Sequence, residues 1–500
     1  MTDIFPVEHL CKNSSITGEY TGFSRRSGKP ILLPRATSGI AAVPASISRP
    51  QLTLMGSALG FAVVLLDVSV VNVALDAFRD GFSASVVGLE WIVNAYTLTF
   101  AALLLMAGAL GDRFGARKIF LAGFVLFTLA SLACGLASTL TALIGARIVQ
   151  GAGAALLVPN SLSLIRHAFP DHEQRSRALG LWSATGGIAL AAGPLAGGLL
   201  VAHFGWRSIF LINLPIGLIG LTMTLRFAPP CPAHAQRKLD VPGQTAAFVA
   251  LAALAIALIE AGNLGWTHPR IVGALLTAVV GTLAFVAIEA KQADPMLPLA
   301  LFRSRDFKIA SVSGIFVNFA YYGLIFVFSL FFQWQLKLTP EQTGLAFLPM
   351  TVVLMLANII ASRLITRLGA RRLMVAGQAL AALGYLLLIP ALVADSYAML
   401  IVPMLMAASG IALVVPTMTN ITLSSVDPSR SGIASAVLNT ARQVGGMLGV
   451  AVCGYLIRDT APSAFAHGIQ LSLLAAVALL VLGGLLSFFG LERRRKLVAA

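Results

Sequence analysis

The chain has 500 residues, of which 58% are hydrophobic and only 11% are charged. A soluble globular protein carries about a quarter charged residues, so the composition excludes that class and indicates a polytopic membrane protein. The formal net charge of +15 would suit a nucleic-acid-binding protein if the basic residues were clustered. They are dispersed over short turns between apolar runs instead, so no nucleic-acid partner is expected.

Residues 1–50 are polar and lack the apolar core of a signal peptide. The basic residues of this segment are Lys12, Arg25, Arg26, Lys29, Arg35 and Arg49. We predict a disordered basic cytoplasmic tail. The alternatives are a functional arm that binds the membrane surface or a partner, a passive tail, and an overextended start site.

The apolar runs that follow match the roughly 20 residues with which a helix crosses a bilayer. They show none of the two-residue alternation of an outer-membrane barrel, and a helix satisfies its own backbone hydrogen bonds in lipid. The sequence therefore predicts an all-α membrane protein with fourteen spans. These are expected at 52–75, 87–110, 117–137, 140–165, 177–201, 207–227, 243–262, 270–290, 308–333, 342–365, 372–393, 397–422, 431–457 and 467–490.

Basic residues predict the orientation of the spans, because Lys and Arg concentrate on the cytoplasmic side. If the N-terminus is cytoplasmic, the tails and the loops on that side hold nearly all of them. The loops on the other side hold only Arg79, Arg207, Arg270, Lys337 and Arg458, while Arg147 and Arg442 lie inside spans. We expect an integral protein of the cytoplasmic (inner) membrane with both termini in the cytoplasm.

An internal repeat predicts two halves. Gly108–Gly123 aligns with Ser362–Gly377, which pairs Arg113 with Arg367, Gly115 with Gly369 and Arg117 with Arg371. Parallel repeats of this kind are typical of transporters in which two bundles rock around a central site. We expect two six-helix bundles in a pseudo-twofold arrangement at 51–227 and 306–490, a two-span insert at 228–305 and a basic cytoplasmic tail at 491–500.

Several motifs resemble the major facilitator superfamily, and more narrowly its fourteen-span drug:proton antiporter family. The loop GALGDRFGARK at 108–118 resembles the superfamily motif, with Ala116 where a basic residue is common. The narrower family is resembled by LDVSVVNVAL at 66–75, RIVQGAGA at 147–154, GPLAGG at 193–198 and GWRSIFLINLPIG at 205–217. These matches cover the first half well and the second half thinly.

The resemblance implies a proton-coupled exporter of small amphipathic organic compounds, of the multidrug efflux type, that works by alternating access. It also implies that a cytoplasmic gating loop locks the two halves when the cavity faces outward. The residues of this loop are Gly108, Asp112, Arg113, Gly115, Arg117 and Lys118. Topology alone explains the basic residues, but it does not require Asp112, because the repeat has Thr366 there.

Pro194 removes an intrahelical hydrogen bond and is expected to bend span 5. Gly193, Gly197 and Gly198 make a flat face against which another helix can pack. On the residues alone, ordinary helix packing is the simpler interpretation. The resemblance favours an antiporter helix kink, because the family associates this element with exporters.

Charged groups inside spans are costly unless they are paired or hydrated, so they are functional candidates. Asp67 and Arg147 both lie about 10–12 Å from the outer ends of their spans, which allows them to meet. Our hypothesis is that Asp67 binds and releases the coupling proton while Arg147 sets its protonation equilibrium. The alternative is a static structural ion pair.

Other polar residues suggest where a substrate binds. Arg442 either recognises an anionic substrate or bonds backbone carbonyls, and the second half lacks the intramembrane acids that would suit a polycation. Glu90 and Glu260, near the outer face, are the remaining acids that a cationic substrate could use, and the favoured interpretation is that they are wetted interfacial residues. The predicted cavity residues combine aromatic and amide groups that suit amphipathic molecules, although such side chains also face lipid or pack against neighbours. They are Asn72, Asn94, Tyr96, Asn318, Tyr321, Tyr322 and Arg442.

The remaining residues favour no other class of protein. The four cysteines and seven histidines show no ligand-like spacing, so no metal, cofactor or disulfide is predicted. No cluster of catalytic groups suggests an enzyme, and no pore-lining stripe or signalling module suggests a channel or receptor. The expected partners are a small-molecule substrate, protons and the lipid bilayer. A dedicated metabolite exporter of the same fold is the main alternative, and an accessory partner is unknown.

Overall fold

The long apolar runs fold into helices, as expected for segments that must satisfy their own backbone hydrogen bonds in lipid. The computed structural model describes residues 48–491 except 234–238, 293–294, 394–395 and 428–429, so the predicted tails lie almost wholly outside the described residues. Every regular element within the described residues is a helix. These elements are α1 (Arg49–Val73), α2 (Leu75–Phe82), α3 (Val86–Phe114), α4 (Ala116–Leu136), α5 (Leu140–Ala168), α6 (His172–Phe204), α7 (Ser208–Leu211), α8 (Asn213–Phe227), α9 (Val241–Leu264), α10 (Pro269–Lys291), η1 (Leu299–Arg303), α11 (Arg305–Trp334), α12 (Pro340–Leu368), α13 (Ala370–Val393), α14 (Tyr397–Ser424), α15 (Ser431–Leu456) and α16 (Pro462–Gly490).

In the described part of the chain, 13 helices are long and apolar enough to cross a membrane. They confirm the prediction of an all-α, polytopic membrane protein. The remaining predicted span corresponds to α15, which has 26 residues but carries Arg442 within a stretch of small and polar side chains. Its closest packing partners are α11 and α3, so neighbouring helices cover much of its surface.

Two predicted spans differ from the structure in detail. Span 1 ends earlier than expected, at Val73, and the expected loop after it contains the short helix α2. The sixth span is divided between α7 and α8. By contrast, α6 continues without a break in its helix through Pro194 to Phe204.

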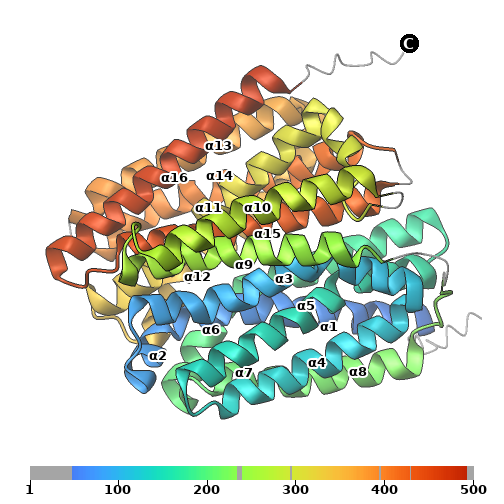
Figure 1. The fold of residues 1–500 in the computed structure, drawn as a ribbon, viewed down its shortest axis with the longest axis horizontal. Helices are drawn as coiled ribbons and strands as arrows, with labels where there is room; N and C mark the ends of the chain where they lie inside the picture. The colour runs from blue at the N-terminus through green and yellow to red at the C-terminus, as the bar shows by residue number, and fades with distance from the viewer. Residues whose placement is uncertain (1–47, 234–238, 293–294, 394–395, 428–429, 492–500) are drawn as a thin grey trace, which may run out of the picture. The chain divides into compact units, whose positions relative to one another are not determined.

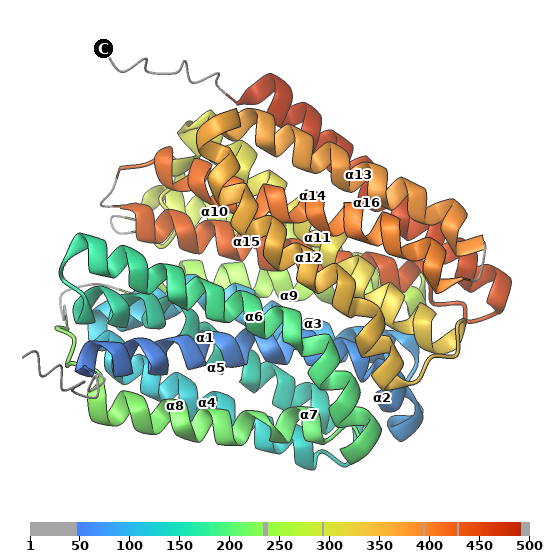
Figure 2. The same ribbon diagram turned by 180° about the vertical axis from the view of Figure 1, so that it is seen from behind.

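Helices α1–α8 pack mainly among themselves, as do helices α11–α16; we call these the first and second helix groups. Figures 1 and 2 show the first group on one side of the molecule and the second group on the other. Two pairs of helices join the groups most extensively, α6 with α12 and α3 with α15. The residue boundaries of the domains stay a prediction.

Helices α9 and α10, from the predicted insert, pair with each other. Only α9 also packs against helices of both groups, namely α3 and α15. It therefore lies beside one of the two main junctions between the groups, as Figure 1 also shows.

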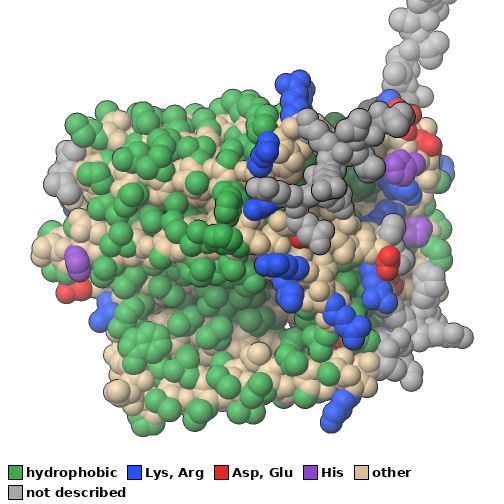
Figure 3. Space-filling model, turned by 90° about the horizontal axis from the view of Figure 1, so that it is seen from above, with side chains coloured by type: hydrophobic (Ala, Val, Ile, Leu, Met, Phe, Trp, Pro, Cys, Tyr) green, Lys and Arg blue, Asp and Glu red, His purple; other side chains and the backbone are tan. Residues whose placement is uncertain are grey.

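Basic side chains mark one end of the molecule. On the face drawn in Figure 3, most Lys and Arg side chains gather toward the end where α16 finishes, while apolar side chains cover the middle and the other end. We call the end where α16 finishes the basic end, and we call the end farthest from it the opposite end. An apolar band of this kind beside a basic end suits a protein that sits in a bilayer.

Candidate functional site

Asp67 and Arg147 form a buried ion pair inside the first helix group. Asp67 comes from α1 and has an exposed fraction of 0%, and Arg147 comes from α5 with an exposed fraction of 1%. Nη1 of Arg147 donates a hydrogen bond to Oδ2 of Asp67. The structure thus brings together the two charges that the sequence places at similar depth, while their role in proton coupling stays a prediction.

Two amides complete the surroundings of the Asp67 carboxylate. Its Oδ1 accepts a hydrogen bond from Gln150 Nε2 at 2.8 Å and another from Asn213 Nδ2 at 3.0 Å. Both amides also donate to Ser131 Oγ on α4, at 3.2 Å and 3.0 Å. Four helices, α1, α4, α5 and α8, therefore meet in one buried polar cluster, which we call the Asp67 cluster.

Sequence reasoning missed Gln150, Asn213 and Ser131 as members of this cluster. Signals were present for the two amides: Gln150 follows Arg147 by one helical turn and so lies on the same helix face, and Asn213 is an amide within an apolar span. Ser131 gave no signal, because small hydroxyl residues are common in membrane helices.

Arg147 connects the cluster to α3. Its Nε donates to the carbonyl of Ile92 at 3.1 Å, and its guanidinium carbon lies 4.2 Å from the centre of the Tyr96 ring. One charged side chain therefore holds a carboxylate on α1 and the backbone of α3. Neutralising Asp67 would weaken the contact between Arg147 and α1 relative to its contact with α3, because a neutral carboxyl group attracts a guanidinium far less than a carboxylate does.

The glycine–proline element of α6 packs against two helices. A Cβ at Gly193 would lie 2.3 Å from the Cβ of Ser69 on α1, and one at Gly198 would lie 2.5 Å from the carbonyl oxygen of Pro340 on α12. In return, a Cβ at Gly344 of α12 would lie 2.4 Å from the carbonyl oxygen of Pro194. Only glycine allows backbones to approach this closely, so the element sits where the first helix group touches the second.

Residues of the predicted gating loop contact their own helix group. Gly115 has a φ of +93°, which favours glycine, and joins α3 to α4. Arg117 Nη2 donates to the carbonyl of Leu225 at 2.6 Å. A Cβ at Gly111 would lie 1.8 Å from Oδ1 of Asn160, so α3 and α5 also meet closely here. Asp112 lies in the last turn of α3, half-buried, and its role in gating stays a prediction.

The predicted cavity residues do not line the small cavity of the second helix group, but several of them lie near one another. Tyr322 packs against the apolar cluster that contains Tyr96, and Arg442 lies close to Tyr322. Asn94 is fully buried, and neither its amide nitrogen nor its amide oxygen has a hydrogen-bond partner among the described residues, whereas Asn318 donates to a carbonyl of its own helix. The rings of Tyr321 and Tyr322 lie 5.1 Å apart on α11. Tyr96 belongs to the surroundings of Arg147, as described above.

Arg442 has few partners. Its Nη1 makes a long contact of 3.4 Å with Oδ1 of Asn439, and its buried Nε has no hydrogen-bond partner among the described residues. No backbone carbonyl accepts from it in the described part of the chain, so the structure does not favour the carbonyl-bonding alternative. The anionic-substrate alternative stays a prediction.

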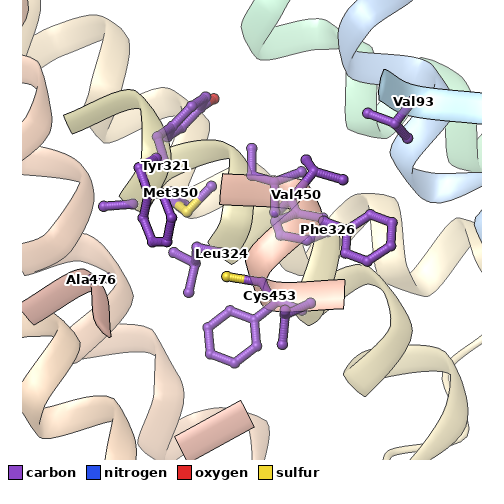
Figure 4. Packing of buried hydrophobic residues seen from close by; sticks show 14 of the residues in the cluster. Val93, Tyr321, Leu324, Phe326, Met350, Val450, Cys453 and Ala476 are labelled. Carbon is purple, nitrogen blue, oxygen red and sulfur yellow. The ribbon is translucent and has the colours of Figure 1, made fainter. Parts of the chain in front are cut away.

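A small cavity lies elsewhere, within the second helix group. Phe319, Leu324, Tyr385, Cys453, Ser472 and Ala476 are among its lining residues. Figure 4 shows Leu324 and Cys453 close to Val450 and Phe326 in this apolar region. None of the predicted cavity residues lines it.

The expectation that Glu90 is wetted is wrong. Its exposed fraction is 0%, and both carboxylate oxygens are buried without a hydrogen-bond partner in the part of the chain that the structure describes. The reason is that α15 covers this face of α3, which no local sequence pattern reveals. Glu260 is half-buried and accepts a hydrogen bond of 2.7 Å from Trp91 Nε1.

Several contacts close the junction of the two helix groups at the opposite end. Asp76 of α2 accepts a hydrogen bond of 2.5 Å from Trp334 Nε1 at the end of α11. The guanidinium of Arg79 lies 4.4 Å from the centre of the same indole. One turn earlier on α11, Ser329 Oγ donates to the carbonyl of Asn72. We call this set of contacts, together with the α6–α12 contacts at Gly198 and Gly344 and the α3–α15 contact between Glu90 and Gly454, the seam.

Comparison with known proteins places this geometry in context. A family model described as Major Facilitator Superfamily matches residues 57–450 and 310–499. The chain is 41% identical over 445 residues to the methylenomycin A resistance protein of Streptomyces coelicolor, a match that covers 89% of this chain and 93% of that protein. It is 37% identical to the multidrug resistance protein Stp of Mycobacterium tuberculosis, covering 82% of this chain and 76% of that protein. It is 34% identical to the tetracenomycin C resistance and export protein of Streptomyces glaucescens, covering 86% and 80%.

Solved structures with low sequence identity share the fold. A D-xylose–proton symporter superimposes with a TM-score of 0.66 at 15% identity, covering 89% of this chain and 98% of the symporter. A bacterial homologue of the human lysosomal transporter Spinster gives a TM-score of 0.62 at 18% identity, covering 89% and 97%. At this identity the likeness concerns the helix arrangement alone.

Proposed function

Because the chain belongs to the Major Facilitator Superfamily, we propose that it is a secondary transporter that exports small organic compounds in exchange for protons. Support for export comes from relatives that match most of the chain and are named for antibiotic resistance, multidrug resistance or export. The observation that carries proton exchange is the buried Asp67–Arg147 pair, because a carboxylate in a span is the group that can take up a proton.

In the proposed mechanism, the protonation state of Asp67 controls the position of Arg147. The charged carboxylate holds the guanidinium and two amides. Protonation removes the negative charge, so Arg147 keeps its bond to the Ile92 carbonyl while its hold on α1 weakens. A proton on Asp67 thus changes how tightly α1 and α3 are tied together, and these helices both contribute to the seam.

We place the basic end in the cytoplasm and the protein in the cytoplasmic membrane, because basic residues concentrate on the cytoplasmic side of membrane proteins. With this orientation, we propose that the seam closes the external side in the state that faces the cytoplasm. In the opposite state the gating loop around Asp112 closes the cytoplasmic side. The two states together give alternating access across a site between the helix groups.

Inside-out membrane vesicles test this proposal. An imposed gradient with a more acidic lumen is expected to drive accumulation of at least one member of a panel of cationic, neutral and anionic compounds. Vesicles with equal amounts of Asp67→Asn are expected to lose gradient-driven accumulation, because the asparagine cannot bind the coupling proton. Asp80→Asn, which changes an exposed acid of α2, serves as the matched control and is expected to keep it.

Two results would contradict the proposal. If the pH gradient drives accumulation of no compound in the panel, the protein does not exchange these substrates for protons, and the proposal is contradicted. Undiminished gradient-driven transport by Asp67→Asn shows that another group carries the coupling proton, and reduces the Asp67–Arg147 pair to a structural contact.

A further inference from the structure

Glu90 is a buried acid that the Asp67 cluster does not use. It lies in the second turn of α3, and neither carboxylate oxygen has a hydrogen-bond partner among the described residues. Gly454 of α15 faces it, and a Cβ there would lie 2.3 Å from Oε1 of Glu90. The carboxyl group of the first helix group therefore fills the space left by a glycine of the second, within the seam.

Ionisable groups on the neighbouring helices do not neutralise Glu90. On α9, Glu260 lies close enough for its charge to act on Glu90, and both are acids. On α15, the thiol of Cys453 is a near neighbour. Arg458, just after the end of α15, is exposed. Its guanidinium lies over the Tyr455 ring and donates to the Tyr455 carbonyl rather than to Glu90.

On α5, the buried cation Arg147 is already paired. Arg147 donates to the carbonyl of Ile92, close to Glu90 along α3, but its charge is matched by Asp67. Helices α3, α9 and α15, which surround Glu90, contribute Val87, Ile259 and Ala451 to one apolar cluster. Glu90 thus occupies an apolar junction beside a second acid.

A carboxylate in such surroundings is strongly unfavourable, because burial removes its water and no cation or hydrogen-bond donor replaces it. The neutral carboxylic acid has no charge to desolvate and fits the same space. The closed seam therefore accommodates Glu90 in its protonated form.

We propose that Glu90 is a second proton-binding site, separate from Asp67, and that it must be protonated before α3 and α15 can close the seam. When these helices separate, water reaches the carboxyl group and stabilises its charged form, so the proton returns to water on that side. When they close, a carboxylate oxygen takes a proton from a hydronium ion in the same water: the O–H bond of the carboxylic acid forms as an O–H bond of the hydronium ion breaks, which leaves a neutral water molecule. Acidity on the external side thus favours the closed seam.

This inference rests on the proposed alternation between two states, but it needs neither a substrate nor proton coupling at Asp67. Its test is therefore a distance measurement in the absence of substrate. Spin labels at Ser83→Cys, before α3, and Thr460→Cys, after α15, report the width of the seam; both positions are exposed. Cys11 and Cys231 are replaced by serine, and the buried Cys134 and Cys453 are kept.

In purified full-length protein we expect the short-distance population to dominate at acidic pH and the long-distance population to grow as the pH rises, because a higher pH favours the charged carboxylate that the closed seam excludes. Glu90→Gln keeps the shape but cannot ionise, so it is expected to show the short distance throughout. Glu260→Gln is a second test variant. It removes the neighbouring negative charge, so Glu90 ionises more readily. The pH at which half of the protein has an open seam is therefore expected to shift to a lower value.

A distance distribution in the native sequence that does not change with pH overturns the proposal. So does a Glu90→Gln variant that still opens as the pH rises, because another group then controls the seam. The distance measurement reports conformation alone, so it can support or overturn the role of Glu90 even if the vesicle assay detects no transport.

Discussion

Asp67 is held by one cation and two amides, and this set explains how a charge persists in the middle of a helix bundle. Arg147 balances its charge, and Gln150 and Asn213 supply the remaining hydrogen bonds. Asn213 is the member of the cluster that comes from α8. It donates to both Asp67 and Ser131, and these hydrogen bonds connect α8 to α1 and α4. A buried acceptor that loses such a donor costs about 1–3 kcal/mol.

Asn213→Leu therefore tests the cluster at the scale of one residue. The substitution leaves Asp67 Oδ1 with one donor fewer, so we expect a loss of about 1–3 kcal/mol in stability and a lower midpoint of thermal unfolding in detergent. Thr222→Leu, an exposed position of the same helix whose hydroxyl bonds only its own backbone, is the control and is expected to change the midpoint little. Equal midpoints for the two variants would show that Asn213 contributes nothing to the cluster.

At the scale of elements, α6 is a helix with two packing faces. Gly193 and Gly197 lie against α1, and Gly198 lies against the start of α12. The first face stays within one helix group, and the second crosses to the other. A change on the second face should therefore alter the equilibrium between states more than it alters folding of either group.

Gly198→Ala is the corresponding prediction. Its methyl group would lie 2.5 Å from the Pro340 carbonyl oxygen, which belongs to the backbone and cannot rotate away, so α6 and α12 must move apart. We expect spin labels at Ala202→Cys and Leu345→Cys to report a longer distance, together with slower transport. Gly187→Ala lies on the same helix with nothing within 4 Å of the added methyl group, and it should match the parent protein. A Gly198→Ala protein with the parent distance would refute the close contact.

At the scale of the whole molecule, the sequence predicts the helices and their sidedness well, because both depend on local composition. Apolar runs set the spans, and basic turns mark one end. It also predicts that Asp67 and Arg147 meet, because helix rise converts their positions into depth.

The contacts between distant helices escape such reasoning. Asp76 and Trp334 are 258 residues apart, and no local pattern links them. Glu90 is buried because α15 covers it, and a helix that is apolar on every side gives no periodic signal of which face meets a neighbour. Gln150 carried a local signal, because it lies one helical turn from Arg147. The convergence of Asn213 on Asp67 could not be seen, because it depends on how α8 is rotated against α1.

The most direct test of the account is proton movement that depends on substrate. Purified protein is reconstituted in liposomes that contain a pH-sensitive dye, and a compound transported in the vesicle assay is added on one side without an imposed pH gradient. We predict that movement of the compound down its gradient drives protons the opposite way with the native protein, and that Asp67→Asn shows no such proton movement. Substrate movement without proton movement in the native protein, or equal proton movement in Asp67→Asn, would contradict the account.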